Sequence, residues 1–461
     1  MAQKDLEKSR IHMLKKSAPK KGRYVLYWMQ QSQRAEYNHA LAYAVGQADE
    51  LEQGVLVLFA LMDDYPEANR RHYAFMLEGL LETRNALAKM GILMVIRKEH
   101  PVNAAVSLGA DASLIVCDRG YLRHQIAWRR QLAEKAVCPV IQVESDVVVP
   151  VEVASSKAEY AARTFRPRIH KHIKAYSKKL RFASPIHSSL GLRIKGLEID
   201  EPEAVLERLK IDGSIGAVPR FFKGGTSRAK ALFKDFINAR LARYTENSNQ
   251  PQTDDISHMS PYLHFGQISS LYLALEIQRA AEKYKANVEA YIEQLVVRRE
   301  LAMNFVTYTP DYDAVSCLPQ WARKTLREHG KDSREYLYSL EQLVNAETHD
   351  PYWNACMLEM RHTGFMHNYM RMYWGKKILE WSQTPEKAFE IMLYLNNAFF
   401  LDGRDPNSYA GVGWIFGLHD RAWSERPVFG KVRYMAASGL ERKCDIRSYV
   451  EKVDRLVKEE A

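Results

Sequence analysis

The sequence is poor in cysteine and has no long apolar stretch. No run of eighteen apolar residues occurs, so the sequence predicts no membrane-spanning helix. The five cysteines lie far apart and form no C-x-x-C pair, which argues against structural zinc and disulfides and favours a reducing, cytoplasmic setting. Residues 1–22 are lysine-rich and lack an apolar signal core, so we expect them to form a flexible basic tail.

Signatures of several common enzyme mechanisms are also missing. No G-x-G-x-x-G follows the first predicted strand and no P-loop lysine motif occurs, which argues against a dinucleotide bound in the usual Rossmann manner. The glycines of 411–417 have the wrong spacing for such a loop and follow no predicted strand. HExxH, Cys–His and G-x-S-x-G motifs are absent, so the sequence predicts no metal site and no covalent nucleophile.

The composition is that of a globular protein. The chain has 461 residues, 46% hydrophobic and 26% charged, which suits two or three domains and leaves room to enclose a large cofactor. The formal net charge is +10 and the sequence pI is about 9.1, values compatible with a polyanionic partner but also found in proteins without one.

Two kinds of periodicity divide the chain. Short apolar runs alternate with amphipathic segments over 23–150, which predicts an open, Rossmann-like parallel α/β sheet. A long interdomain linker over 151–225 follows, and 226–461 has apolar spacings of three and four, which predicts an all-α domain. The predicted strands are 24–28, 54–59, 91–96, 114–117 and 139–143, with helices near 35–50, 68–90, 101–109 and 121–136. The helices predicted later in the chain are 226–245, 266–283, 286–307, 334–346, 352–360, 363–382 and 384–396.

Two local patterns in the helical part suggest chemistry. Trp374 and Trp381 are seven residues apart, so on one helix they share a face, and Trp353 lies close by in sequence. Taken alone they are core aromatics, but beside a cluster of Asn, Asp and Arg they are also candidate electron carriers. Hydroxyls and a proline in 257–269 precede a predicted helix, which favours either an anion seat or a capped helix start.

Several motifs together resemble one known family. Thr363-Gly-Phe-Met-His-Asn-Tyr-Met-Arg-Met372, Asn396-Asn397 and the stretch 402–414 resemble the flavin-binding half of the photolyase/cryptochrome family. Tyr27-Trp-Met-Gln-Gln-Ser-Gln-Arg34 and Val296-Val-Arg-Arg-Glu-Leu-Ala302 resemble its class II DNA photolyases. The resemblance covers 23–440 and rests on five motifs in the expected order.

The resemblance implies FAD, active as FADH⁻, held in a U shape inside the helical domain. Asn396 would then face the flavin N5, where an amide can both accept and donate a hydrogen bond, although helix C-capping is an alternative role. The cofactor-binding residues that the resemblance implies are Tyr244, Ser257, His258, Met259, Ser260, Arg299, Asn368, Arg371, Asn396, Asp402 and Asp405.

The resemblance also implies a light-driven reaction. Excited FADH⁻ gives an electron to a cyclobutane pyrimidine dimer in UV-damaged DNA, the ring bonds split, and the electron returns. Oxidised flavin is re-reduced from the surface through Trp381, Trp353 and Trp374, in that order. The catalytic residues implied are Asn396, Arg371, Asp402 and these three tryptophans.

A dimer that reaches a buried flavin must leave the duplex. The resemblance assigns its apolar wall to Met372 and Trp414 and its edge recognition to Glu293, Gln294 and Arg298. Class II relatives often have two acidic residues at the Glu293-Gln294 pair, and some carry tryptophan at the position of Arg298. A basic loop bearing Arg421, Trp423 and Arg426 would grip phosphates at the rim, or form an ordinary solvated face.

Other functions remain open from sequence. The first is a cryptochrome-type photoreceptor without repair activity, and the weakest is a nucleic-acid-binding module without flavin. A photolyase for 6-4 photoproducts would need a histidine pair that His258, His264, His362 and His367 do not match. The resemblance leaves open whether the α/β domain holds an antenna chromophore, because family members use an 8-hydroxy-5-deazaflavin, a folate or none. We expect a monomer without an obligate protein partner, cytoplasmic and associated with the nucleoid through DNA.

Overall fold

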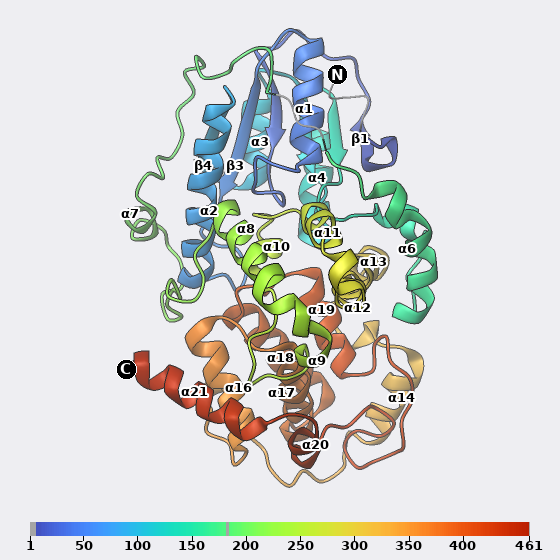
Figure 1. Cartoon of the computed structure of the whole chain (residues 1–461). Helices are drawn as coiled ribbons and strands as arrows, with labels where there is room; N and C mark the ends of the chain where they lie inside the picture. The colour runs from blue at the N-terminus through green and yellow to red at the C-terminus, as the bar shows by residue number, and fades with distance from the viewer. Residues whose placement is uncertain (1–5, 181–183, 461) are drawn as a thin grey trace.

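The first half of the chain forms a six-stranded sheet with helices on both faces (Figure 1). The computed structural model describes residues 6–180 and 184–460. The strand order is β1-β6-β5-β2-β3-β4, parallel except for the antiparallel edge strand β1. The strands are β1 Ile11–Lys15, β2 Tyr24–Trp28, β3 Val55–Leu61, β4 Leu93–Lys98, β5 Ala112–Asp118 and β6 Val140–Val143.

The two faces of the sheet have separate cores. All five residues of β2 are buried, with Val25 and Tyr27 on one face and Tyr24, Leu26 and Trp28 on the other. This double burial explains why the central strands are continuous apolar runs. Helices α1 His39–Glu50 and α2 Arg70–Lys89 cover the first face, and α3 Pro101–Gly109 and α4 Arg123–Lys135 the second.

The basic N-terminal segment corrects one expectation. A flexible tail was predicted over 1–22, but Lys8–Arg10 forms a short 3-10 helix (η2) and β1 pairs with β6. Arg10 is fully buried and donates to the carbonyls of Glu144, Val147 and Val148 at 2.6–3.2 Å. Residues 1–5 lie outside the described residues. The prediction failed because a short, lysine-flanked edge strand has the composition of a solvated tail.

The connection between the halves runs along the outside of the sheet. It contains α5 Val151–Ala154, α6 Ala162–Tyr176 and α7 Pro202–Leu206. Helix α7 packs on α2 at one edge of the molecule, and α6 stands at the opposite edge beside α12 and α13 (Figure 1). The backbone N–H of Leu197 donates to the carbonyl of Ile96 in β4, so the segment between α6 and α7 contacts the edge strand of the sheet.

The second half is helical, so the predicted fold class is confirmed. Two helices contain π-turns, η3 and η5, which a 3.6-residue pattern does not reveal. Among the described residues, no helix is both long and apolar enough to cross a membrane. The elements are α8 Thr226–Asp235, η3 Phe236–Arg240, η4 Leu241–Arg243, α9 Tyr244–Asn247, α10 Ser260–His264, α11 Ser270–Gln278, α12 Ala281–Ile292, η5 Glu293–Arg298, α13 Arg299–Tyr308, η6 Val315–Cys317, α14 Gln320–Glu328, α15 Leu340–Val344, α16 Pro351–Thr363, α17 Asn368–Trp381, α18 Pro385–Phe399, α19 Pro406–Ile415, α20 Ala437–Lys443 and α21 Ile446–Glu460.

The helix predicted over 363–382 begins later than expected. Gly364 ends α16 in a left-handed conformation (φ 71°), where a Cβ atom would lie 3.0 Å from the Leu401 side chain. The His367 side chain then caps α17 by accepting from the Tyr369 N–H at 3.2 Å. This break matters for function because α17 carries Arg371, Met372 and two of the three tryptophans.

Candidate functional site

A bidentate ion pair joins α17 to the turn after α18. Both terminal nitrogens of Arg371 lie 3.0 Å from the carboxylate oxygens of Asp402, and Arg371 Nε donates to the Met366 carbonyl. The guanidinium carbon lies 3.9 Å from the centre of the Phe400 ring. The pair is mostly buried, at 21% and 11% side-chain exposure. Charge, hydrogen bonds and stacking together fix the guanidinium in one orientation.

Asn396 lies in the last turn of α18, next to that pair. The helix continues to Phe399, so Asn396 does not act as its C-cap. Its amide nitrogen donates to Asn397 Oδ1 at 3.1 Å, and the Asn397 amide donates to Glu67 at 2.6 Å. A Cβ atom on Gly403 would lie 2.7 Å from the Asn396 carbonyl, so the turn that carries Asp402 packs directly on this helix end.

The α/β half holds the end of α18 in place. Arg71 donates to the carbonyls of Phe399 (2.7 Å), Met360 (3.0 Å) and Arg361. Asn69 Nδ2 donates to the Ala398 carbonyl at 2.7 Å, and His72 Nε2 contacts the Phe400 carbonyl at 3.0 Å. These residues start α2, a helix that sequence analysis treated only as a sheet cover. No local motif marks their role, because their partners lie some 300 residues away.

The three tryptophans lie in one hydrophobic core cluster of the helical half. Trp353 and Trp381 have ring centres 5.7 Å apart, and Trp353 Nε1 donates to the Trp374 carbonyl at 3.0 Å. All three are buried. Beyond Trp381, the rings of half-buried Tyr338 and exposed His349 lie 5.3 and 5.2 Å from its ring. The rings of Trp353 and Trp381 are therefore in contact, and Trp353 adjoins Trp374 through the Trp374 backbone carbonyl.

The predicted anion seat lies against α17. Ser257 Oγ is 3.1 Å from the Tyr291 hydroxyl, and the Tyr291 ring packs on that of Tyr244. His258 adopts a left-handed backbone (φ 55°), and its Nε2 lies 2.6 Å from Asp254. Met259 is buried and Ser260 begins α10. Phe365 contacts both the His258 ring and the Arg371 guanidinium, so this loop and the ion pair belong to one region.

Buried polar atoms in this region lack partners among the described residues. They include His258 Nδ1, His367 Nε2 and Trp374 Nε1. Native proteins seldom leave such groups unsatisfied, so these atoms fit a polar group of a bound cofactor. Asn368, at the start of α17, is exposed.

Arg299 and Asp405 lie where the two halves meet. Arg299 donates to the Asp146 carbonyl at 2.8 Å and lies 3.4 Å from its carboxylate. Asp405 caps α19 by accepting from the Asn407 N–H and lies 3.5 Å from His264 Nδ1. Burial raises the pKa of Asp405, but the hydrogen bond and charge of His264 outweigh it, and the net pKa is lowered. In this structure the charge of Arg299 is thus directed at Asp146.

Trp414, one of the two residues of the predicted lesion wall, belongs to a row of alternating cations and aromatic rings. The Lys376 ammonium lies 5.2 Å from the Trp414 ring, and the Arg433 guanidinium lies 5.6 Å from that ring and 4.8 Å from Trp423. Arg421 covers Trp423 at 4.9 Å. We call these five residues the cation–aromatic row; it leads from buried Lys376 to exposed Arg421. Met372 and Trp414 are half-buried, and Arg426 stacks on Tyr434.

The candidate lesion readers have different environments. Glu293 accepts two hydrogen bonds from Arg166, at 2.9 and 2.7 Å, and one from Arg298 at 3.1 Å. Burial raises its pKa, but these guanidinium contacts outweigh the burial and lower it overall. Gln294 and Arg298 are exposed. Glu293 is therefore engaged in holding η5 to α6, and Gln294 is the freer side chain.

A cavity lies at the carboxyl ends of β2 and β3. Trp28, Gln30 and Met62 line it from the sheet, and Arg404 and Asp405 line it from the helical half. The carboxylate of Asp118 accepts the backbone N–H groups of residues 30–32, each at 2.9 Å, and so fixes the loop after β2. Ligands of open α/β sheets bind at this edge, which makes the cavity a second candidate site.

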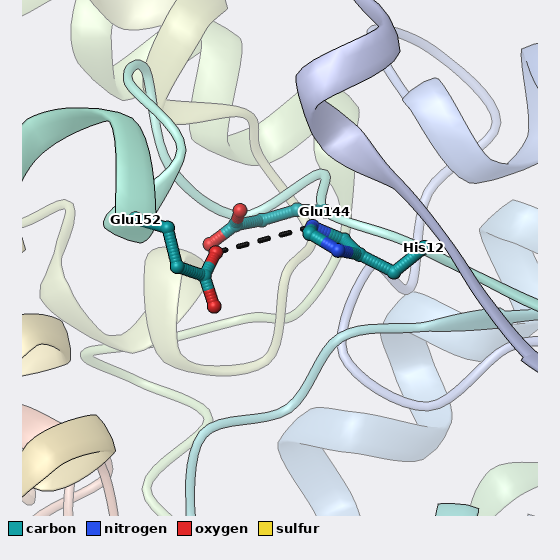
Figure 2. A group of neighbouring side chains, drawn as sticks. All are labelled: His12, Glu144 and Glu152. Atoms are coloured by element: carbon teal, nitrogen blue, oxygen red, sulfur yellow. Dashed lines mark ion pairs between the residues drawn. The ribbon is translucent and has the colours of Figure 1, made fainter. Parts of the chain in front are cut away.

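Figure 2 shows a cluster of His12, Glu144 and Glu152, whose possible ligand atoms lie within 4.8 Å of one another. His12 Nε2 is 3.9 Å from Glu152. Arg119 donates to both oxygens of Glu152 at 2.5–2.6 Å and lies 3.4 Å from Glu144. The Arg119 guanidinium pairs with both carboxylates, so we interpret the cluster as an ion-pair network that ties β1 to α5.

A parallel-sheet half joined to a helical half is the photolyase/cryptochrome fold. The structure of a class III photolyase from Agrobacterium tumefaciens is similar over 95% of this chain and 86% of its own, with a TM-score of 0.73 and 16% identity. A photolyase from Sulfolobus tokodaii, solved "with two FAD molecules", is similar over 93% and 89%, with a TM-score of 0.68 and 17% identity. These likenesses establish the fold.

Sequence similarity establishes the family. The DNA photolyase family profile matches residues 25–185. A deoxyribodipyrimidine photo-lyase from Methanothermobacter thermautotrophicus is 48% identical over 440 residues, which are 95% of this chain and 96% of that protein. The chain therefore belongs to the DNA photolyase family, whose members are FAD-containing enzymes of light-driven DNA repair.

Proposed function

We propose that this enzyme is a class II photolyase that repairs cyclobutane pyrimidine dimers. The observation that carries the proposal is the convergence of the Arg371–Asp402 pair, Asn396 and the 257–260 loop on one buried region, with Met372 of the lesion wall on the same helix as Arg371, α17. FAD bound there in its reduced form supplies, on absorbing blue light, the electron that splits the dimer.

The residues of this region act by binding and orientation. The Arg371–Asp402 pair offers a donor and an acceptor to the edge of a flat ring, and Asn396 presents an amide of defined orientation because Asn397 and Glu67 hold it. Ser257 and Ser260 offer hydroxyls to phosphates. Trp414 and Met372 offer an apolar wall to a flipped-out pyrimidine dimer.

The direct test is repair of defined substrates. Purified protein is expected to contain flavin and, once reduced, to restore an oligonucleotide carrying one cyclobutane dimer under blue light but not in the dark. A 6-4 photoproduct substrate serves as the specificity control. Flavin-loaded, reduced protein that leaves the cyclobutane dimer intact would instead favour the photoreceptor alternative.

We infer that Gln294 reads the lesion edge, because Glu293 is engaged by two guanidinium groups. Gln294→Ala is expected to weaken binding to dimer-containing DNA about tenfold, the effect of one or two lost hydrogen bonds, and to leave binding to undamaged DNA unchanged. Gln131→Ala, an exposed glutamine on α4, is the matched control. Equal losses on both DNAs would assign Gln294 a structural role.

We propose that Trp374, Trp353 and Trp381 carry electrons inward from the surface. The 5.7 Å contact of Trp353 with Trp381 and its hydrogen bond to the Trp374 backbone support short steps. Trp374→Phe is expected to abolish photoreduction of the oxidised protein, followed by absorbance, while chemically reduced protein still repairs DNA. Trp128→Phe, in the α/β half, is the control. Loss of both activities in Trp374→Phe would contradict the relay.

We propose that the α/β domain, 23–150, takes a second, light-harvesting chromophore in the cavity beside Trp28 and Asp405. The second FAD in the Sulfolobus tokodaii structure, described there as implying a novel light-harvesting cofactor, supports this assignment. Titration with 8-hydroxy-5-deazaflavin, folate and FAD is expected to saturate at one equivalent for one of them. Ala60→Trp, which fills the cavity wall, should abolish that binding and leave the FAD of the helical domain, 226–461, in place.

A further inference from the structure

The net charge of the chain is concentrated in one segment. Residues 160–197 contain ten Lys and Arg and no Asp or Glu, and the whole chain has a formal net charge of +10. The remainder of the protein is therefore close to neutral. Most of the segment's basic residues belong to α6 and the turn after it.

Helix α6 presents its cations on the side opposite its buried face. Ala162, Phe165 and Ile169 are buried, whereas Arg163, Lys171 and Lys174 are exposed. These three side chains project from one side of the helix, and the eleven rises from Arg163 to Lys174 cover about 16 Å of axis. Within the described part of the chain, no carboxylate pairs with them, unlike Arg166 and Arg168. We call Arg163, Lys171 and Lys174 the α6 strip.

The α6 strip adjoins the proposed DNA-binding surface. Arg166 is bound to Glu293 of η5, beside exposed Gln294. Tyr160, just before α6, donates from its hydroxyl to the Asp420 carbonyl, and its own carbonyl lies 2.8 Å from His419 Nδ1. The start of α6 is thus fixed between η5 and the rim loop, and Figure 1 places α6 beside α12 and α13 on that side of the molecule.

We propose that the α6 strip binds the phosphate backbone of duplex DNA that flanks the lesion. The inference rests on the proposed repair function, because that function defines the adjoining surface as the DNA face. Three unpaired cations along 16 Å match a row of regularly spaced phosphates, and solvated cations of this kind bind without reading bases. The strip therefore contributes affinity for any duplex and no discrimination between damaged and intact DNA.

The salt dependence of DNA binding tests this inference. The triple variant R163Q/K171Q/K174Q is expected to reduce the slope of log Kd against log salt by about 2–3 units, because each lost phosphate contact removes about 0.9. The reduction should be equal for an undamaged duplex and for the same duplex with one dimer. The matched control is K89Q/K135Q/K210Q, two exposed lysines of the α/β half and one of the connection after α7, with the same change in charge, and its slope should equal that of the wild type.

The outcomes separate the two proposals. An unchanged slope in the triple variant, or a loss confined to damaged DNA, would overturn the role of the α6 strip. If the triple variant has a reduced slope on both DNAs but the reduced wild-type protein does not repair the dimer under blue light, the role of the strip is supported and the proposed reaction is rejected. Retained flavin absorbance and an unchanged unfolding midpoint in the triple variant show that the substitutions act at the surface.

Discussion

Lys376 is a fully buried lysine in the middle of the functional helix α17. Its ammonium donates to the Ile415 carbonyl at 2.5 Å and faces the Trp414 ring. Burial lowers its pKa to about 7, with Asp420 raising it and Arg433 lowering it further. The Lys376 ammonium therefore fixes the orientation of Trp414 in two ways, by its hydrogen bond to the adjacent Ile415 carbonyl and by its contact with the face of the Trp414 ring.

Lys376→Met is expected to change how stability depends on pH. The unfolded lysine has a pKa near 10.5, so between about pH 7 and 10.5 the unfolded chain binds more protons, and stability rises with pH. This group should contribute about 2 kcal/mol of added stability between pH 7.5 and 9 in the wild type, and nothing in the variant. Urea unfolding at both pH values measures the difference. The same rise in both proteins would show that the lysine titrates normally.

At the scale of elements, the connection after β6 is held from both sides. Arg10, next to β1, donates hydrogen bonds to backbone carbonyls of this connection. The carboxylate of Glu300, in α13, accepts hydrogen bonds from the backbone N–H groups of Val148 and Val149 at 2.5 and 3.2 Å. Burial raises the pKa of Glu300 to about 8, an effect that these hydrogen bonds only partly offset. The segment that ends in β1, which the sequence did not predict as a strand, and helix α13 of the helical half therefore both bind the backbone that follows β6.

Arg10→Met tests whether this clamp stabilises the fold. The change leaves three buried carbonyls without their donor, so the free energy of unfolding is expected to fall by about 3 kcal/mol. Lys16→Met, an exposed neighbour beyond β1, should change it by less than about 0.5 kcal/mol. Hydrogen exchange of the β1 amides should accelerate only in the Arg10 variant. Unaltered exchange there would mean that β1 is held by its ladder alone.

Glu300→Gln tests the other side of the clamp. The folded pKa lies above the unfolded one, so the folded state binds more protons between about pH 4.5 and 8, and stability falls as pH rises through that window. Gln keeps an acceptor and cannot ionise, so the variant should gain stability relative to wild type on going from pH 5 to pH 8. Glu289→Gln, an exposed residue of α12, should track the wild type in thermal unfolding. A constant gap between wild type and Glu300→Gln would contradict the assignment.

At the scale of the whole molecule, the two halves form one functional unit. The sequence was enough to predict the sheet, since strands such as β2 are buried on both faces. The family resemblance of two separate motifs was enough to assign Arg371 and Asp402 to one site, where the two side chains form an ion pair. The sequence could not reveal that Arg71 and Lys376 support the site, because their roles depend on backbone carbonyls distant in sequence. Every residue has a backbone carbonyl, so a contact to a carbonyl leaves no recognisable residue type at the partner position in the sequence.

Arg71→Met is expected to weaken flavin binding from a distance. Arg71 fixes the carbonyls of Met360 and Phe399, and the end of α18 carries Asn396, so its loss should destabilise the fold by about 3 kcal/mol and release flavin. Arg70→Met on the same helix is the control. Among the residues that the structure describes, the Arg70 side chain pairs only with exposed Glu203 and Glu207, and such pairs contribute less than about 1 kcal/mol. Flavin retained per protein after gel filtration, compared with the unfolding midpoint, distinguishes the effects. A destabilised Arg71 variant that keeps full flavin occupancy would mean that the helical half shapes the site without support from the sheet domain.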